Sequence, residues 1–163
     1  MPGLSYSLPA WECKTGSKLR KIKGSVCASC YALKGNYTRY PAIKDAQYVR
    51  LEALKDTKWI AAMVAQIIRQ KYFRWHDAGD IQDMKHLYKI FRVCELTPET
   101  RHWMPTREAQ FLKDIDPETV PKNLIIRMSS HMVDQGPVNF WPWTSTVTSG
   151  QDASCPAPTQ GGQ

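Results

Sequence analysis

The stretch YFRWHDAGD, residues 72–80, indicates the fold class more directly than any other part of the chain. It starts with an aromatic run, Tyr72 to Trp75, which is typical of a β-strand. It ends in the polar residues His76, Asp77, Gly79 and Asp80. Apolar side chains then recur at helical spacing, at Met84, Leu87, Phe91 and Cys94. We expect a strand that leads through a polar turn into a helix, with Asp80 as the N-cap.

The alternation of strands and helices continues on both sides of this stretch. The sequence predicts helices over residues 41–55 and 57–68, strands over 102–106 and 124–128, and a short helix over 107–114. Residues 139–148 are aromatic and β-branched, and are candidates for another strand. Strands that alternate with helices favour a parallel sheet with right-handed crossovers. The sequence therefore predicts an α/β fold.

Polar residues follow three of the predicted strands. The first set is His76, Asp77 and Asp80, the second is Thr106 and Arg107, and the third is Ser129, Ser130 and His131. In parallel sheets, ligand sites form at the carboxyl ends of the strands. Strand ends are also polar simply because loops are exposed. The presence of His, Asp and Arg, rather than only Ser and Gly, favours a functional edge.

Four of the five cysteines are candidate metal ligands. Cys27 and Cys30 form a C-x-x-C pair, Cys13 lies upstream of a basic loop, and Cys155 lies near the end of the chain. Four thiolates can hold a zinc ion in a tetrahedron or ligate a four-iron cluster. A redox dithiol has the same C-x-x-C spacing, but no predicted strand precedes this pair. Cys94 lies on an apolar helix stripe and is expected to be structural.

The length and composition of the chain fit one compact domain. It has 163 residues, of which 42% are hydrophobic and 23% are charged. We expect residues 1–150 to form a single α/β cluster-binding domain, in which residues 1–40 are an irregular cysteine-rich segment. Residues 151–163, which carry Cys155, are rich in Gly, Pro and Gln and are predicted to be a flexible tail.

The charge and hydropathy limit the partners. The net charge of +7 fits a polyanion such as nucleic acid, and it also fits a basic surface without a dedicated partner. Six tryptophans and seven tyrosines indicate either stacking surfaces or a well-filled core. No apolar window is long enough to span a bilayer, and the N-terminus does not resemble a secretory signal. We therefore expect a cytoplasmic protein with reduced thiols and no membrane contact.

The run from Cys27 to Tyr37, CASCYALKGNY, resembles the signature of the phage gene-product-88 family. Three further elements match that family in the same order: His76-x-x-Gly79-Asp80, Pro105-Thr106-Arg107 and Cys155-Pro156-Ala157. This resemblance covers most of the chain. It implies a phage-encoded protein that works in the cytoplasm of the host cell.

The family pattern is similar to that of radical S-adenosylmethionine enzymes, which pair a cysteine-rich loop with a parallel α/β barrel. This resemblance implies a partial, half-barrel-like parallel sheet flanked by helices. It also implies a 4Fe–4S cluster held by Cys13, Cys27, Cys30 and Cys155. The cofactor-facing residues would be His76, Asp77, Gly79, Asp80, Thr106, Arg107 and Ser129, with Arg107 as an anion contact. The radical enzymes usually have a compact C-x3-C-x2-C loop, whereas thirteen residues separate Cys13 from Cys27 here.

Three classes of function follow. The first is a cluster-binding protein with four cysteine ligands, whose work would be electron transfer to a redox partner, structural or regulatory. The second is a radical S-adenosylmethionine-like enzyme, in which three cysteines leave one iron open to a small-molecule cosubstrate. The third is a zinc-stabilised nucleic-acid-binding module, for which the positive charge and the aromatic residues are suitable.

Overall fold

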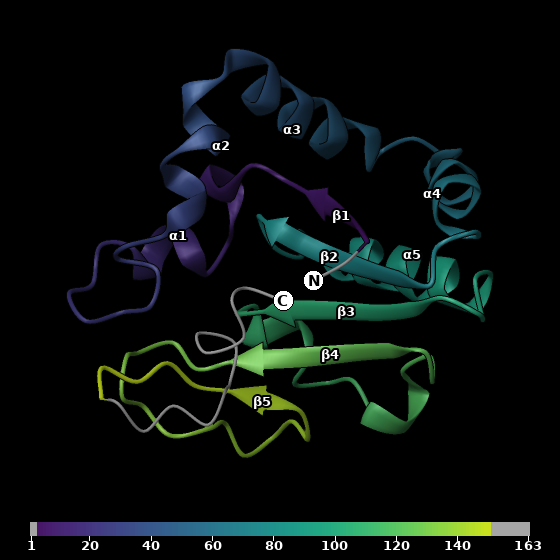
Figure 1. Ribbon diagram of the computed structural model, residues 1–163. Coiled ribbons are helices and arrows are strands. Elements are labelled where there is room, and N and C mark those ends of the chain that lie inside the picture. The colour runs from purple at the N-terminus through teal and green to yellow at the C-terminus, as the bar shows by residue number, and fades with distance from the viewer. Residues whose placement is uncertain (1–2, 151–163) are drawn as a thin grey trace.

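The computed structural model describes residues 3–150, which fold around a five-stranded parallel sheet (Figure 1). The strands are β1 (Leu4–Ser7), β2 (Tyr72–Ala78), β3 (Arg101–Thr106), β4 (Leu124–Ser129) and β5 (Thr144–Ser145). They lie in the sheet in the same order as in the sequence. Each crossover therefore leads to the adjacent strand, as in a β/α barrel. The predicted α/β fold with a parallel sheet is confirmed.

Three helices of two turns or more flank the sheet. They are α3 (Pro41–Ala53), α4 (Trp59–Ile67) and α5 (Met84–Glu95). The shorter elements are α1 (Gly16–Leu19), α2 (Asn36–Arg39), and the 3-10 turns η1 (Ala10–Glu12), η2 (Tyr31–Leu33), η3 (Ala109–Phe111) and η4 (Pro117–Thr119). Figure 1 shows α5 behind β2 and β3. None of the helices in residues 3–150 has the length and apolar content needed to cross a bilayer.

The core lies between the sheet and these helices. Trp75 of β2 is completely buried, and its ring packs edge-on against Phe73 at a centroid distance of 4.8 Å. Trp59 of α4 packs against Tyr6 of β1, and its indole Nε1 donates a hydrogen bond to the Tyr6 hydroxyl at 3.1 Å. Trp141 is also buried. Part of the high aromatic content therefore fills the core.

Three local details differ from the sequence-based expectations. Residues 1–40 were expected to be irregular, but they include β1, which pairs with β2 from Leu4 opposite Phe73. The N-cap of α5 is Asp83, whose carboxylate accepts a hydrogen bond from the His86 amide at 2.7 Å, so the prediction of Asp80 was wrong. The short helix predicted over residues 107–114 is reduced to the turn η3.

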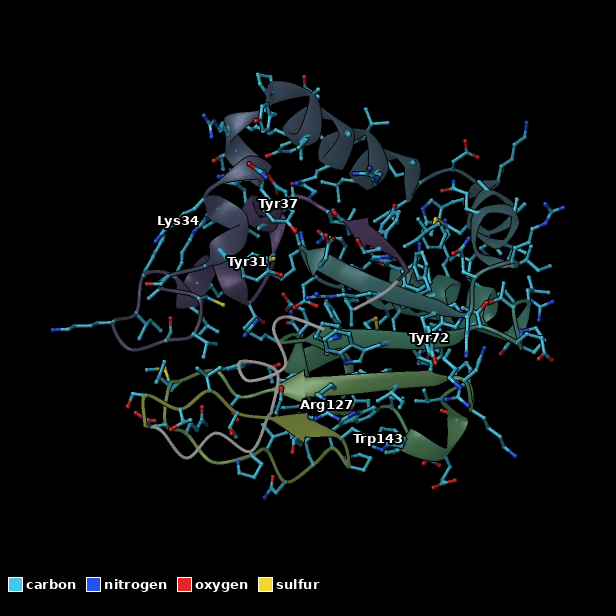
Figure 2. The ribbon with its side chains drawn as sticks, in the orientation of Figure 1. Tyr31, Lys34, Tyr37, Tyr72, Arg127 and Trp143 are labelled. Atoms are coloured by element: carbon cyan, nitrogen blue, oxygen red, sulfur yellow. The ribbon has the colours of Figure 1, made fainter. Side chains whose placement is uncertain are left out.

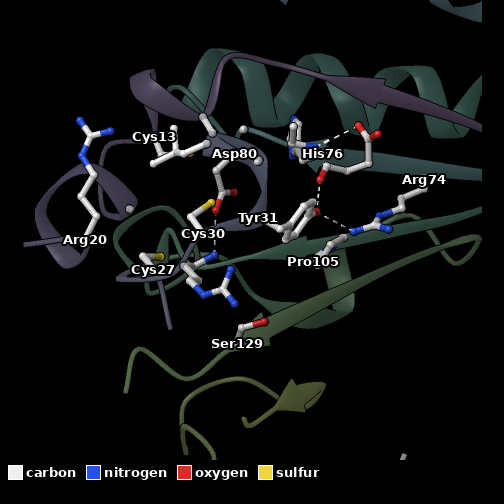
Figure 3. Close-up of a pocket in the computed structure, with 18 residues that line it drawn as sticks. Cys13, Arg20, Cys27, Cys30, Tyr31, Arg74, His76, Asp80, Pro105 and Ser129 are labelled. Atoms are coloured by element: carbon white, nitrogen blue, oxygen red, sulfur yellow. Dashed lines mark hydrogen bonds between the residues drawn. The ribbon is translucent and has the colours of Figure 1, made fainter. Parts of the chain in front are cut away.

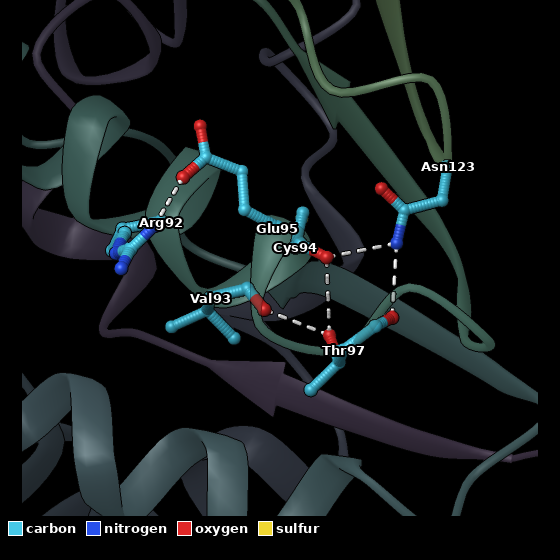
Figure 4. Close-up of polar contacts among 6 residues, drawn as sticks. All are labelled: Arg92, Val93, Cys94, Glu95, Thr97 and Asn123. Carbon is cyan, nitrogen blue, oxygen red and sulfur yellow. Dashed lines mark hydrogen bonds and ion pairs between the residues drawn. The ribbon is translucent and has the colours of Figure 1, made fainter.

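A single side chain ties the end of α5 to the start of β4 (Figure 4). The Asn123 amide Nδ2 lies 2.9 Å from the Cys94 carbonyl oxygen and 3.0 Å from those of Thr97 and Thr100. The last carbonyls of a helix lack partners within the helix. Asn123 supplies donors to this region and fixes the crossover between α5 and the sheet.

Candidate functional site

A cavity of about 180 Å³ lies at the carboxyl edge of the sheet, where the N-terminal segment meets the strand ends (Figure 3). Its walls come from η1, α1 and the cysteine loop on one side. The ends of β2, β3 and β4 form the other side. This is the edge at which a parallel sheet places its ligand sites.

Three thiols line this cavity, namely those of Cys13, Cys27 and Cys30. Gly16 lies between two of them. A Cβ atom at Gly16 would be 3.7 Å from the sulfur of Cys13 and 3.7 Å from the sulfur of Cys27. It would also lie 3.0 Å from the Cβ of Cys13, so glycine at position 16 allows α1 to pack directly against Cys13 and Cys27.

All four cysteines in residues 3–150 are free thiols. Burial, followed by the nearby Asp80 and Glu108 carboxylates, raises the pKa of Cys13. Burial also raises the pKa of Cys27, while Arg107 opposes that shift. Within residues 3–150, no three His, Cys, Asp or Glu side chains converge closely enough to form a ready single-ion site. Without a bound cation, the buried thiols are held in the neutral form.

Asp80 joins the ends of β2 and β3 from within the cavity wall. One carboxylate oxygen accepts hydrogen bonds from the Thr106 hydroxyl at 2.6 Å and from the Ile81 amide at 2.8 Å. The other accepts from the Arg107 amide at 2.9 Å. Burial raises the pKa of Asp80 to about 6, against the effect of these donors. Thr106 contacts Asp80 and does not itself line the cavity.

Asp77 holds the cysteine loop against β2. Its carboxylate accepts hydrogen bonds from the Ser7 hydroxyl at 2.5 Å and from the Tyr37 hydroxyl at 3.0 Å. The Tyr31 hydroxyl donates to the Asp77 carbonyl oxygen, and Arg74 reaches the same hydroxyl at 3.5 Å. The two tyrosines that follow Cys30 therefore have a physical role, because they anchor the loop that carries the thiols.

His76 and Gly79 shape the turn at the end of β2. His76 has a φ of 56°, in the left-handed region that few non-glycine residues adopt, at an irregularity in the pairing of β1 with β2. It is buried, and neither ring nitrogen has a hydrogen-bond partner in the described part of the chain. Burial keeps its pKa well below the usual value, so the ring is neutral. Gly79 has a φ of 79°, and a Cβ there would lie 2.5 Å from the Leu8 Cβ.

Two groups at the site were not predicted. Glu108 is completely buried, and its carboxylate accepts hydrogen bonds from the Thr15 amide at 2.8 Å and from the Thr15 hydroxyl at 2.7 Å. It thereby fastens the chain next to Cys13 to the end of β3. The sequence held one signal for Glu108, namely its position directly after the motif Pro105-Thr106-Arg107. The other is Arg74, which lines the cavity and which no sequence pattern set apart from other basic residues. Arg20, which lines the cavity too, belongs to the basic loop between Cys13 and Cys27.

The structure brings most of the predicted site residues together. The cavity is lined by Cys13, Cys27, Cys30, His76, Asp77, Gly79, Asp80, Arg107 and Ser129. Cys155 lies outside the described residues. Cys94 is completely buried in the core on α5, as its apolar stripe predicted.

Comparison with known proteins gives one match. The model of a family described as Gene product 88 matches residues 1–156. No curated protein and no solved structure matches the chain. The similarity to radical S-adenosylmethionine enzymes therefore stays a prediction.

Proposed function

The chain belongs to the gene product 88 family, and from this premise we propose that it binds a 4Fe–4S cluster in the cavity at the carboxyl edge of its sheet. Cys13, Cys27 and Cys30 would be three of the ligands, and Cys155 is the candidate for the fourth. The proposal rests on one observation: three free thiols, brought from distant parts of the N-terminal segment, line the same cavity.

The donor chemistry supports a cluster. Soft thiolates select iron–sulfur clusters and zinc over hard cations. A zinc ion needs its donors to converge on one point, whereas the thiolates of a four-iron cluster bind different irons. The described thiols share a cavity without forming a single-ion site. Three thiols around one cavity suit the several irons of a cluster.

The charges at the cavity suit an anionic centre, and they would suit a zinc ion held by four thiolates equally well. Four thiolates leave an oxidised four-iron cluster with a net charge of about −2. Arg20 and Arg107 line the cavity, and Arg107 opposes the burial that raises the pKa of the Cys27 thiol. Binding requires that the thiols lose their protons, and these cations favour that loss.

The bound cluster would supply one-electron transfer, and the number of cysteine ligands would decide how the protein uses it. With Cys155 as a fourth ligand, the cluster would be closed and would serve a redox partner. With three ligands, one position would face the cavity, where His76 and Arg74 could contact a cosubstrate such as S-adenosylmethionine. The neutral ring of His76 would then be a hydrogen-bonding group, because its nitrogens have no partner in residues 3–150.

The test is the iron and sulfide content of anaerobically purified protein, together with its absorption spectrum. We expect about four irons and four sulfides per chain. Changing Cys13, Cys27 or Cys30 to Ser should abolish loading, whereas Cys94→Ala should leave it intact. Colourless protein after anaerobic reconstitution would refute the proposal, and so would cluster loss in the Cys94 variant alone. Stoichiometric zinc in place of iron would favour the zinc alternative.

A second comparison separates the two uses of the cluster. If Cys155→Ser loses the cluster, the site is closed. If that variant keeps the cluster, and S-adenosylmethionine changes the electron paramagnetic resonance signal of the reduced protein, the radical-like enzyme is supported.

A further inference from the structure

One face of the parallel sheet has no helix of residues 3–150 over it (Figure 1). The opposite face packs against α4 and α5, where Trp75, Met104 and Ile126 are completely buried. Parallel sheets are normally covered on both faces. The uncovered side, here called the open face, is therefore a surface available for a ligand or partner.

Aromatic and basic side chains alternate on the open face. It carries Tyr72 and Arg74 from β2, Arg101 and Trp103 from β3, Arg127 from β4, and Trp143 just before β5. The register pairs Tyr72 with Arg101 and Arg74 with Trp103. Trp143 directly precedes Thr144, which pairs with Met128, and its carbonyl oxygen accepts a hydrogen bond from the Met128 amide at 2.9 Å. Figure 2, in the same orientation as Figure 1, shows Tyr72, Arg127 and Trp143 across this side of the molecule.

The open face is positively charged without local compensation. Its alternate positions carry three arginines, and the nearest carboxylate along these strands is Asp77, which already binds Ser7 and Tyr37. The two ion pairs in the described residues, Lys55–Glu52 and Arg92–Glu95, involve none of these arginines. The whole chain, these arginines included, has a net charge of +7. A polyanion is therefore the complementary ligand.

We infer that the open face binds single-stranded nucleic acid. Exposed bases stack on aromatic rings while basic side chains contact the phosphates, and the open face offers both groups side by side. The guanidinium of Arg74 lies 4.9 Å from the centroid of the Trp103 ring. The Arg74 guanidinium lies over the Trp103 ring, and bases stack on guanidinium groups as well as on rings.

Other occupants fit the open face less well. A second copy of this face would bring the arginines of both chains together without carboxylates. A membrane surface would need more aliphatic side chains than Ile125, the one exposed aliphatic residue of β2, β3 and β4. Duplex DNA keeps its bases stacked, so the aromatic rings would have no bases to contact.

The test is fluorescence anisotropy of the full-length protein with fluorescein-labelled oligothymidylate and oligouridylate of about 20 nucleotides. We expect salt-sensitive binding, with a slope of log affinity against log salt of about −2 for three arginine contacts. Tyr72→Ala and Trp103→Ala should each weaken binding about tenfold. Arg127→Glu should weaken binding and reduce the slope by about 0.7 or more. A preference for one oligonucleotide would identify DNA or RNA as the natural ligand.

The matched controls are Tyr88→Ala and Lys85→Glu, which change exposed residues of α5 on the other side of the sheet. Lys85→Glu alters the net charge by the same amount as Arg127→Glu. Both controls should bind like the unchanged protein, and circular dichroism should show that every variant is folded. Absence of binding, equal losses in the controls, or a dimer that Arg127→Glu dissociates would overturn the inference. The outcome does not depend on the cluster, because none of the changed residues is a proposed ligand.

Discussion

Gly16 provides a test of the cluster that does not remove a thiol. A Cβ atom at this position would lie 3.0 Å from the Cβ of Cys13 and 3.7 Å from the sulfurs of Cys13 and Cys27. The backbone itself does not require glycine, because Gly16 begins the helical turn α1. We expect Gly16→Ala to keep the helical turn, since alanine has the higher helix propensity, and to displace Cys13 by a few tenths of an ångström. The added methyl group would occupy space beside both sulfurs. The iron content should therefore fall by half or more, measured after reconstitution.

Gly136→Ala is the matched control, because a Cβ there would meet no atom within 4 Å. It should load iron like the unchanged protein. Full loading of the Gly16 variant would show that the space between those two sulfurs is not used by the cluster.

His102 links the stability of the fold to pH. It is buried against Phe73 and Trp75, contacts the Thr97 hydroxyl at 2.9 Å, and faces no charged group among these neighbours. Burial lowers its pKa from 6.5 to about 4. Between these values, the unfolded chain binds a proton that the folded chain does not, so stability falls as the pH falls.

At pH 5, the unfolded chain carries a proton on His102 that the folded chain lacks. This difference lowers the free energy of unfolding by about 2 kcal/mol relative to pH 7.5. Urea unfolding of cluster-free protein at both pH values measures the change. His102→Gln should reduce the loss of unfolding free energy on acidification by about 2 kcal/mol. An identical loss in the variant and the unchanged protein would contradict the burial of a neutral His102. His86, whose pKa burial also lowers to about 4, should maintain the remaining acid sensitivity.

Among the elements, the junction between α5 and β4 depends on Asn123. Asn123→Ala would remove a donor to three carbonyl oxygens, and those of Cys94 and Thr97 would keep the bonds from the Thr97 and Thr100 amides. We expect a loss of about 2 kcal/mol in the free energy of unfolding, measured by urea denaturation. Arg92→Ala, which breaks the exposed Arg92–Glu95 pair in Figure 4, should cost less than about 0.5 kcal/mol. Equal effects of the two changes would contradict this role of Asn123.

The sequence predicted the central elements well because their apolar patterns are long. The predicted strands at 102–106 and 124–128 correspond to β3 and β4, and the helix stripe ending at Cys94 corresponds to α5. β1 was missed because its four residues, LSYS, show no apolar run. It is held by pairing with β2 and by the packing of Tyr6, neither of which is visible in local sequence.

The site was predictable where residues carry a motif or follow a strand, as Cys27, Cys30 and Asp80 do. Glu108 was missed because its partner, Thr15, is 93 positions away. Asp80 was predicted to cap α5 because its carboxylate could accept hydrogen bonds either from the first turn of a helix or from a neighbouring strand. Only the position of β3 shows that its carboxylate accepts a hydrogen bond from Thr106 rather than capping α5.

For the whole molecule, loading of the proposed cluster should stabilise one part of the chain more than another. The cysteine segment, residues 10–40, is joined to the remainder by contacts that include the bonds of Thr15 to Glu108 and of Tyr37 to Asp77. Ligation would add a covalent link among these loops. Removal of iron by a chelator should therefore speed amide hydrogen exchange in residues 10–40, while β3 and β4 stay protected.

Mass spectrometry of exchanged peptides measures this difference. The Cys94→Ala variant, which should keep its cluster, should show the same dependence on iron. A uniform change over all peptides would mean that the proposed ligands support the whole fold rather than their own segment.

The sequential order of the strands also bears on how the chain is made. Each strand pairs only with those that precede and follow it in the sequence. During synthesis, every new strand therefore leaves the ribosome beside an edge that is already in place, and no strand must insert between two others. Growth of the sheet can keep pace with translation, so unpaired strand edges are exposed for only a short time.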